Sequence, residues 1–406
     1  MKFKHFLALL LALILTFSLL ACDKGDENTP ADSDTGIATP EDNNVEETTP
    51  AEETTPEEEE TTAEPAPVIE DKTYNFKDIL DRVKVLGRTT TLADGISFDH
   101  TASTVEFNAY VEGSIKVKLS ISKGGSDSVS DSCYFTLYVD GVKSETRLMA
   151  SSGVDTTLEL GSFAEGGVHN FRLVKQTEAK NSLCLLKTVA FKGYFAEKPA
   201  DAKHYIEFLG DSITVGYGNL IANGGSNPGM AVNQDATQAF AYLTAERVKA
   251  DYSMVAVSGI GVSKGYRQMV MKSYYDASSY YRSTSVKYEP TRIPDVVVIN
   301  LGTNDQNNGV KIDEWQAAVD ALVKQVRAKY GKDVPIVWIF NMMTAGGFYE
   351  QYAQKALNAL GGEPAGLYIC ELIRNNQGGQ NHPNLSAHST AALQLASFME
   401  QKQLLK

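Results

Sequence analysis

The sequence predicts two folded domains, an antiparallel β-sandwich followed by an α/β domain with a five-stranded parallel sheet. Three observations support this fold class. A chain of 406 residues is long enough for more than one core, since single domains usually contain on the order of 100 to 200 residues. Apolar and polar residues alternate with a period of two between residues 71 and 200. From residue 201 onward, apolar runs alternate with helical patterns, which is typical of a parallel sheet.

The first 21 residues have the composition of an export signal. Lys2 and Lys4 precede an apolar stretch, residues 6–20, that is too short to span a bilayer comfortably. The segment continues into Leu-Leu-Ala-Cys, which resembles the lipobox of bacterial lipoproteins, where the cysteine, here Cys22, becomes lipid-modified. The sequence therefore predicts an extracellular protein, lipid-anchored to the bacterial cell membrane. A plain signal peptide followed by a chance cysteine is the alternative.

Residues 22–70 are predicted to be a disordered acidic tether. They contain 17 acidic residues and one basic residue, and they repeat the sequence EETTP twice. Such a segment has too few apolar side chains for a core, and its like charges repel one another. Residues 71–406 contain 34 acidic and 34 basic residues, so the folded part is nearly neutral. A nucleic-acid partner, which requires a basic surface, is therefore not expected.

Residues 71–200 are predicted to form the sandwich. Segments such as STVEFNAYV, CYFTLYVDGV and HNFRLVKQT alternate in polarity, and Asp140-Gly141 is a good hairpin turn. Cys133 and Cys184 lie in this region, where they either pair outside the cell or remain separate buried thiols. No Cys or His pairs occur at zinc-ligand spacing, so no metal site is expected.

Residues 201–406 are predicted to form the α/β domain. Its five apolar runs are expected to be strands, at residues 205–209, 254–257, 296–301, 336–340 and 367–370. Such sheets carry their active sites at the carboxyl ends of the strands. The loops that follow these five runs are therefore the places to look for reactive side chains.

The first and last of these loops contain a candidate nucleophile and a candidate base. Ser212 stands in GDSIT directly after the first strand, and His382 follows the last strand. Ser263 is a rival, because GVSKG fits the G-x-S-x-G pattern, but that pattern places its serine on the turn directly after a strand. Ser263 lies several residues beyond the second strand, so we favour Ser212. His388 falls inside the last predicted helix and is expected to be a packing or surface residue.

Two further loops offer hydrogen-bond donors for an anion. In SGIGV, residues 258–262, a glycine can bring a bare backbone N–H close to a ligand. Asn304 follows the third strand in GTND, where it is either a turn-former or a side-chain donor to an oxyanion.

Together these segments resemble the SGNH (GDSL) hydrolase superfamily. More narrowly, IEFLGDSITVGYGN and PDVVVINLGTND behind a β-sandwich are similar to carbohydrate esterase family 2, deacetylases of plant polysaccharides. The resemblance implies a jelly-roll domain followed by a flavodoxin-like hydrolase domain that needs no cofactor. It implies an acetylated polysaccharide or oligosaccharide as the partner, and acetyl transfer to water as the reaction. An ester of another small acyl group, or carbohydrate binding by a catalytically vestigial protein, are the alternatives.

The resemblance also assigns the site. Ser212 is the expected nucleophile and His382 the expected base. The expected oxyanion hole consists of the Ser212 N–H, the Asn304 side chain and a backbone N–H for which we favour Gly261 over Gly259, because Gly-x-Ser after the second strand matches relatives better.

The sequence departs from the family pattern immediately before His382. Many relatives read Asp-x-His-Pro, whereas Gln380 and Asn381 occupy those places here. Three hypotheses follow: an inactive sugar-binding protein, a carboxylate supplied from elsewhere, or a dyad in which a backbone carbonyl or the Gln380 amide oxygen accepts from Nδ1. We favour the dyad, since an uncharged acceptor still fixes the tautomer and leaves Nε2 free for the serine.

The tyrosine-rich segment at residues 266–288 has two interpretations, a sugar-stacking lip or ordinary packing. The candidate loops contain no long apolar stretch that could line an acyl-chain tunnel, which favours a small acyl group.

Overall fold

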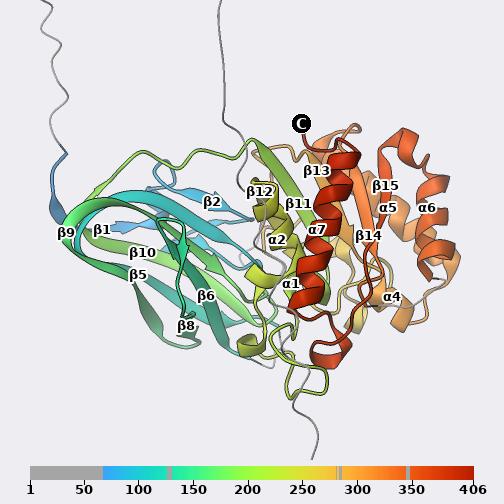
Figure 1. The fold of residues 1–406 in the computed structure, drawn as a ribbon, viewed down its shortest axis with the longest axis horizontal. Coiled ribbons are helices and arrows are strands. Elements are labelled where there is room, and N and C mark those ends of the chain that lie inside the picture. Colours follow the sequence, from blue (N-terminus) through green and yellow to red (C-terminus); the bar gives the residue numbers. More distant parts are fainter. Residues whose placement is uncertain (1–66, 126–129, 280, 283–285, 344–347) are drawn as a thin grey trace, which may run out of the picture. The chain divides into compact units, whose positions relative to one another are not determined.

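The computed structural model describes residues 67–125, 130–279, 281–282, 286–343 and 348–406 (Figure 1). The predicted signal peptide, Cys22 and most of the predicted tether lie outside these residues. Within the described ranges, no helix is both long enough and apolar enough to cross a membrane.

The first sheet is antiparallel and has ten strands. Its central order is β3-β4-β10-β5-β9-β6-β7, with β1 paired to β10, β2 to β5 and β8 to β6. The strands are β1 (Glu70–Asn75), β2 (Lys84–Leu86), β3 (Thr91–Leu92), β4 (Gly95–Ser97), β5 (Thr104–Lys123), β6 (Ser132–Val139), β7 (Val142–Lys143), β8 (Leu148–Ser151), β9 (Asp155–Lys175) and β10 (Ser182–Phe195). The first strand thus begins one residue inside the range predicted for the tether.

Long bent strands turn this sheet into a sandwich. The pairing of β5 with β9 shifts register near Gly113 and again near Lys116, and both strands are strongly curved along their length (Figure 1). Register shifts of this kind increase the local bend of a strand. The inward-facing alternate residues form one core, which includes Val105, Phe107, Phe135, Leu137, Phe171, Leu173, Cys184 and Leu186.

The structure shows the predicted hairpin turn and the state of two cysteines within the sandwich. Asp140 and Gly141 join β6 to β7 with φ angles of 51° and 78°, which confirms the hairpin, because a type I′ turn needs positive φ at both residues. Cys133 and Cys184 are free and buried, so of the two interpretations the separate thiols hold. The Cys133 thiol lies 3.1 Å from the Thr177 hydroxyl.

The second sheet is parallel, with five strands in the order β12-β11-β13-β14-β15, which confirms the predicted fold class. Its strands are β11 (His204–Gly210), β12 (Ala250–Ala256), β13 (Val296–Asn300), β14 (Ile336–Phe340) and β15 (Leu367–Glu371). β12 begins four residues earlier than predicted. Polar Asp251 interrupts the apolar pattern there, but its carboxylate is buried in an ion pair with Lys84 at 2.6 Å.

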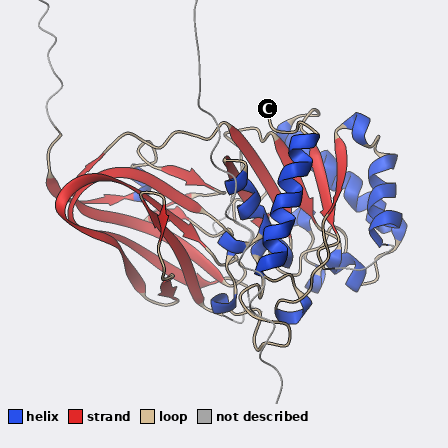
Figure 2. Cartoon of the chain, in the orientation of Figure 1, coloured by secondary structure: helices blue, strands red, loops and turns tan. Residues whose placement is uncertain are grey.

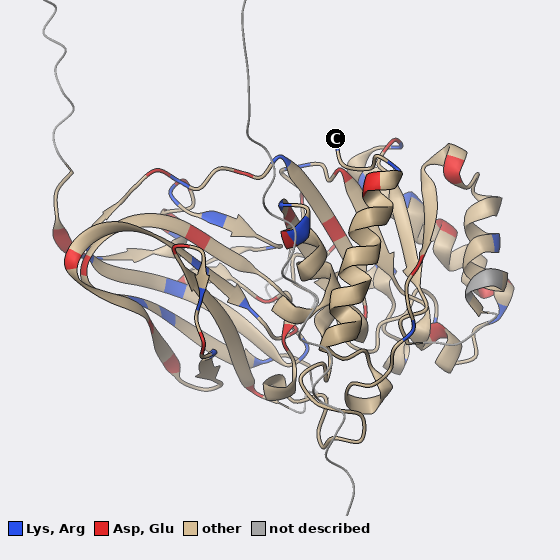
Figure 3. Ribbon diagram, in the orientation of Figure 1, with Lys and Arg blue, Asp and Glu red and all other residues tan. Residues whose placement is uncertain are grey.

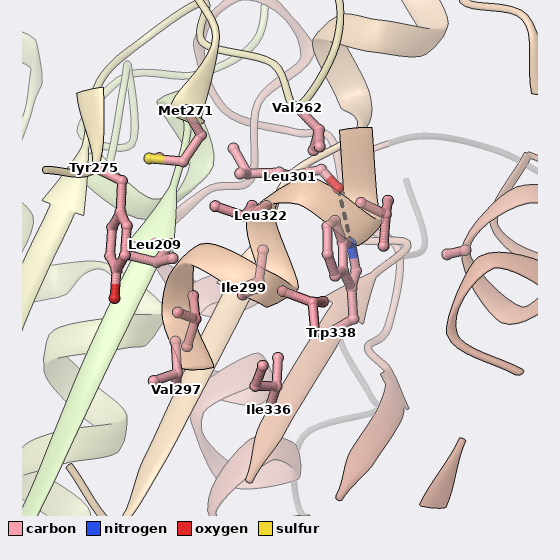
Figure 4. Packing of buried hydrophobic residues seen from close by; sticks show 14 of the residues in the cluster. Leu209, Val262, Met271, Tyr275, Val297, Ile299, Leu301, Leu322, Ile336 and Trp338 are labelled. Atoms are coloured by element: carbon pink, nitrogen blue, oxygen red, sulfur yellow. Dashed lines mark hydrogen bonds between the residues drawn. The ribbon is translucent and has the colours of Figure 1, made fainter. Parts of the chain in front are cut away.

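Helices cover both faces of the parallel sheet (Figure 2). On one face α2 (Phe240–Arg247) and α7 (Leu385–Gln401) pack against Ile206, Phe208 and Val298. On the other, α5 (Ile312–Tyr330) and α6 (Gln354–Ala359) pack against Leu209, Val297, Ile299, Ile336 and Trp338 (Figure 4). The short helices are α1 (Ser212–Val215), α3 (Met271–Tyr274) and α4 (Thr303–Asn307). Consecutive strand residues alternate between the two cores, as a pleated sheet requires.

Buried polar contacts join the sandwich to the α/β domain. Arg88 donates to Glu207 at 2.9 Å, and both side chains have 0% exposure. The hydroxyls of Tyr275 and Tyr330 also donate to Glu207, at 2.8 and 3.0 Å. Elsewhere, acidic and basic residues are interspersed along both domains (Figure 3).

Candidate active site

The structure brings Ser212 and His382 into contact. Ser212 opens α1 directly after β11, where the preceding Asp211 caps the helix by accepting from the Ile213 N–H at 3.0 Å. His382 follows a short 3₁₀ turn, Gly379–Asn381, after β15. Its Nε2 lies 2.8 Å from the Ser212 hydroxyl oxygen, and both residues are 7% exposed. Ser212, and not Ser263, is therefore the serine paired with this histidine.

Backbone carbonyls orient the His382 ring. Nδ1 lies 3.1 Å from the Gln380 carbonyl oxygen and 3.2 Å from that of Gly379. A carbonyl can only accept, so Nδ1 carries the proton and Nε2 is left to accept from the serine. The Gln380 amide oxygen instead accepts from the Tyr217 hydroxyl at 3.0 Å. Two neutral acceptors were predicted for His382 Nδ1, a backbone carbonyl or the Gln380 amide oxygen, and the backbone carbonyls are the ones in contact with it.

An unusual loop conformation directs these carbonyls. Gln380 and Asn381 have φ angles of 53° and 58°, a left-handed region that costs non-glycine residues on the order of 1 kcal/mol or more. Asn223 holds the loop with two hydrogen bonds to Asn381, at 2.8 and 3.2 Å. The Gly379 N–H donates to the Gly218 carbonyl at 3.0 Å. Contacts from the loop after α1 thus hold the backbone that orients the histidine.

Burial disfavours the charged form of the His382 ring. Burial lowers its pKa to about 4, although the hydrogen bonds to the Gln380 and Gly379 carbonyls act in the opposite direction. The ring is therefore neutral at neutral pH. Tyr217 covers it with a ring-centroid distance of 4.6 Å.

The second loop corrects the prediction for Gly261. The Gly261 N–H donates to the Met269 carbonyl at 3.1 Å, so it is not available to an oxyanion. The next three N–H groups donate to the Asp305 carboxylate at 2.7 to 2.9 Å, from Val262, Ser263 and Lys264. The Gly-x-Ser pattern that favoured Gly261 therefore marks an anchored part of the loop.

Gly259 is the donor that remains. Within residues 257–264, it carries the one backbone N–H to which the structure assigns no acceptor among the described residues. Its φ is 91°, which only glycine adopts without strain. The Asn304 amide reaches the same place, donating to the Ile260 carbonyl at 2.9 Å and to Asp211 at 3.2 Å. The three candidate donors, from Ser212, Gly259 and Asn304, therefore follow the carboxyl ends of three adjacent strands, β11, β12 and β13.

The part of the chain that contains Ser212, Gly259 and Asn304 matches a known family. Residues 208–377 match the GDSL-like lipase/acylhydrolase family. This part of the chain is a GDSL-like lipase/acylhydrolase domain.

Two sequence relatives of the chain are esterases by name. A cellulase/esterase of Acetivibrio thermocellus is 28% identical over 324 residues, which are 74% of this chain and 37% of that protein. An acetylxylan esterase/glucomannan deacetylase of Cellvibrio japonicus is 31% identical over 178 residues, 41% of this chain and 48% of that protein. The chain therefore spans less than half the length of either relative.

The match to a solved structure extends beyond the GDSL-like domain. A family two carbohydrate esterase from Clostridium thermocellum, in complex with cellohexaose, has a TM-score of 0.70 and 26% identity. The match covers 79% of this chain and 99% of that one. The resemblance to carbohydrate esterase family 2 is thus confirmed.

Asp211 has a structural place in the GDSL-like domain. It is fully buried, caps α1 and accepts from Asn304. Burial, together with the charge of Asp305, raises its pKa to about 7, although the Ile213 N–H acts in the opposite direction. Its hydrogen bonds to the Ile213 N–H and to Asn304 therefore shape the turn that carries Ser212.

The tyrosine-rich segment mostly packs into the core of the GDSL-like domain. Tyr274 and Tyr275 are buried, whereas Tyr266 is 48% exposed and directly adjoins Gly259. A Cβ added at Gly259 would lie 2.9 Å from the Cβ of Tyr266. The packing interpretation therefore holds for the buried pair, and Tyr266 is an exposed aromatic ring beside the candidate oxyanion donor.

Sequence reasoning missed two residues at this site. Tyr217 lies within the recognised GDSITVGYGN segment, but no pattern shows that its ring covers the histidine. Glu178 belongs to the sandwich, yet it accepts from the Ser258 N–H and hydroxyl. Nothing in the local sequence marks Glu178, because the contact joins residues 80 positions apart. Over the residues that can be described, no group of three or more His, Cys, Asp or Glu side chains is arranged to hold a metal ion.

Proposed function

We propose that the protein is a serine esterase that removes O-acetyl groups from carbohydrate through a Ser212–His382 dyad and an acyl-enzyme. The observation that carries the proposal is the 2.8 Å contact between His382 Nε2 and the Ser212 hydroxyl, with Nδ1 held by carbonyls. The names of the relatives support an acetylated carbohydrate, such as xylan or another plant polysaccharide, as the substrate.

In the first half-reaction, His382 Nε2 takes the hydroxyl proton while the Ser212 oxygen attacks the acetyl carbonyl carbon. The resulting oxyanion accepts hydrogen bonds from the N–H groups of Ser212 and Gly259 and from the Asn304 amide. His382 then protonates the departing sugar oxygen. Water then attacks the acyl-enzyme carbonyl while His382 takes a proton from it, and the intermediate collapses as His382 returns this proton to the Ser212 oxygen, which releases acetic acid that ionises to acetate.

The Asn304 amide has to exchange a partner during this cycle. Its two hydrogens face the Ile260 carbonyl and the Asp211 carboxylate in the free protein. The longer bond, 3.2 Å to Asp211, is the one that an oxyanion would replace. Carbonyls orient the imidazole but stabilise an imidazolium less than a carboxylate does, so the dyad is expected to be slower than a triad.

Carbohydrate recognition is proposed to involve Tyr266. Its exposed ring adjoins Gly259, and the ammonium of Lys180 lies 5.4 Å from the ring centroid. The tyrosine ring presents a large apolar face and a polar hydroxyl at its edge. This combination suits a pyranose, whose C–H face is apolar and whose hydroxyls surround the sugar ring.

A second candidate function is carbohydrate binding by a catalytically vestigial site. The neutral acceptors on His382 and the cellohexaose bound to a solved relative favour this alternative. Hydrolysis of p-nitrophenyl acetate by the wild type and by Ser212→Ala separates the two. Activity that disappears in the variant supports the esterase, whereas inactivity of both proteins with retained glycan binding supports the binder. Acetate release from acetylated xylan, mannan and peptidoglycan then identifies the substrate.

We also propose that the protein is exported and anchored to the outer face of the bacterial cell membrane through lipid on Cys22. The short apolar stretch and the Leu-Leu-Ala-Cys sequence support this. On expression in a bacterial host, the wild type is expected in the membrane fraction and Cys22→Ala outside it. An unchanged distribution would contradict lipid attachment at this cysteine.

A further inference from the structure

We propose that Glu178, supplied by the N-terminal sandwich, is a positioning residue that orients the Gly259 N–H for oxyanion binding. The inference rests on the proposed esterase function. It makes the sandwich part of the catalytic apparatus rather than an appended domain.

Glu178 reaches the second catalytic loop from the connection between β9 and β10. It is 1% exposed, and its two carboxylate oxygens accept separately from Ser258, at 2.6 Å from the N–H and 2.7 Å from the hydroxyl. The connection itself is held in place, because the Asn181 amide donates to the Gly229 carbonyl at 3.0 Å and the Gly125 N–H to the Lys180 carbonyl at 2.7 Å. A fixed segment of the sandwich thus holds the residue immediately before Gly259.

The geometry of the turn explains why this contact matters. The Ile260 N–H donates to the Val257 carbonyl at 3.3 Å, which closes a four-residue turn with Ser258 and Gly259 at its centre. The positive φ of Gly259 at the third position is typical of a type II turn. Types I and II differ by a flip of the central peptide, and that peptide carries the Gly259 N–H. The turn type therefore decides to which side this donor points.

The atoms around the central peptide are held from several directions. The Gly259 carbonyl accepts from the Tyr266 N–H at 2.7 Å, and the Ile260 carbonyl accepts from Asn304. Glu178 holds the remaining side, since both donors of Ser258 point to its carboxylate. Without these bonds, Ser258 loses the acceptor that opposes a peptide flip.

This contact differs in kind from the ion pairs that join the two domains. Asp99 of the sandwich pairs with Arg282 at 2.6 Å, and Arg88 pairs with Glu207, so both contacts match opposite charges. Glu178 instead meets the neutral donors of Ser258. The pKa of Glu178 is raised by burial, and the Ser258 hydrogen bonds and the charges of Lys180 and Lys175 offset this only in part. We attribute the buried carboxylate of Glu178 to its effect on the turn at residues 257–260, where it holds Ser258.

The test compares two substitutions of the same residue. Glu178→Met keeps an unbranched side chain of similar length but removes both acceptors, and kcat per titrated active site is expected to fall about 10- to 100-fold with KM changed less than about threefold. Glu178→Gln can still accept from the Ser258 N–H and can donate to the hydroxyl, so it is expected to retain kcat within about fivefold. Removal of the Ser258 hydroxyl alone, by Ser258→Ala, is expected to lower kcat by about 3- to 10-fold.

Asp99→Asn is the matched control, because it weakens another buried contact of the sandwich without touching the turn. Its kcat is expected to stay within about twofold while the melting temperature falls. A kcat of Glu178→Met within threefold of wild type would overturn the proposal, as would an equal loss in Glu178→Gln. Should Glu178→Met not fold, unchanged kcat in Ser258→Ala overturns it instead. Absence of Ser212-dependent hydrolysis in the wild type is a separate result, which removes the esterase function and this inference together.

Discussion

Replacement of Asn304 by alanine is the sharpest test of the proposed oxyanion hole. The Asn304 amide bridges two catalytic loops, because it donates to Asp211 beside the nucleophile and to Ile260 beside Gly259. Asn304→Ala removes a side-chain amide whose hydrogen bond to the substrate oxygen is expected to become strong only when the oxyanion forms. The loss should therefore appear in kcat and not in KM.

The magnitude follows from the contacts. Removal of one oxyanion donor typically costs about 2.7 to 4 kcal/mol of transition-state stabilisation, so kcat is expected to fall about 100- to 1000-fold. The fold also loses a bond to a carboxylate and one to a carbonyl, together about 2 to 4 kcal/mol of unfolding free energy. Activity has to be measured under conditions in which the variant remains folded.

The assay is hydrolysis of p-nitrophenyl acetate, normalised by titration of active sites and accompanied by urea unfolding. Asn300→Ala is the matched control, since Asn300 ends β13 four positions earlier and donates to the Thr214 hydroxyl at 3.1 Å. It should lose stability and keep kcat within about threefold. Turnover of Asn304→Ala within threefold of Asn300→Ala would refute the assignment of Asn304 as an oxyanion donor.

Four further outcomes are expected. Because the pKa of His382 is lowered to about 4, the base stays unprotonated above that pH, and kcat/KM should fall only as the pH drops through about 4; a limb near 6.5 in the pH–rate profile would contradict this burial effect. Gln380→Ala should keep kcat within about fivefold, since backbone carbonyls hold the ring, and a loss above 100-fold would show that the side chain is needed. Arg88→Ala strands buried Glu207 without its cation and should cost about 3 to 5 kcal/mol in urea unfolding; a cost below about 1 kcal/mol would contradict the buried pair. Tyr266→Ala should raise KM for acetylated xylan several-fold and leave p-nitrophenyl acetate unaffected, whereas equal effects on both would argue against sugar stacking.

Much of this architecture could be predicted from local patterns. The change from alternating residues to apolar runs separated by helices predicted the two sheets, because each period reflects which faces of an element are buried. The places of Ser212 and His382 followed from the rule that parallel strands present their following loops at one edge. The start of β12 at Ala250 was missed, because the local pattern treats polar Asp251 as the end of an apolar run. In the structure Asp251 lies inside the strand, where the ion pair with Lys84 compensates for the burial of its charge.

The choice between Gly259 and Gly261 could not be made in the same way. Both are glycines in one short loop, and their difference lies in where each N–H points after the loop pairs with Met269. Likewise, the acceptor for His382 Nδ1 depends on two left-handed residues held by Asn223, which is distant in sequence.

Periodicity and position relative to strand ends were enough to predict the order of the two domains and the pairing of Ser212 with His382. The packing of distant segments was needed to show which glycine N–H lacks an acceptor, which carbonyls orient the imidazole, and that Glu178 of the sandwich accepts from Ser258. This is because a hydrogen bond depends on the distance and direction between a donor and an acceptor in space. Residue identity shows which groups can bond, and the packing of distant segments selects the pairs that do.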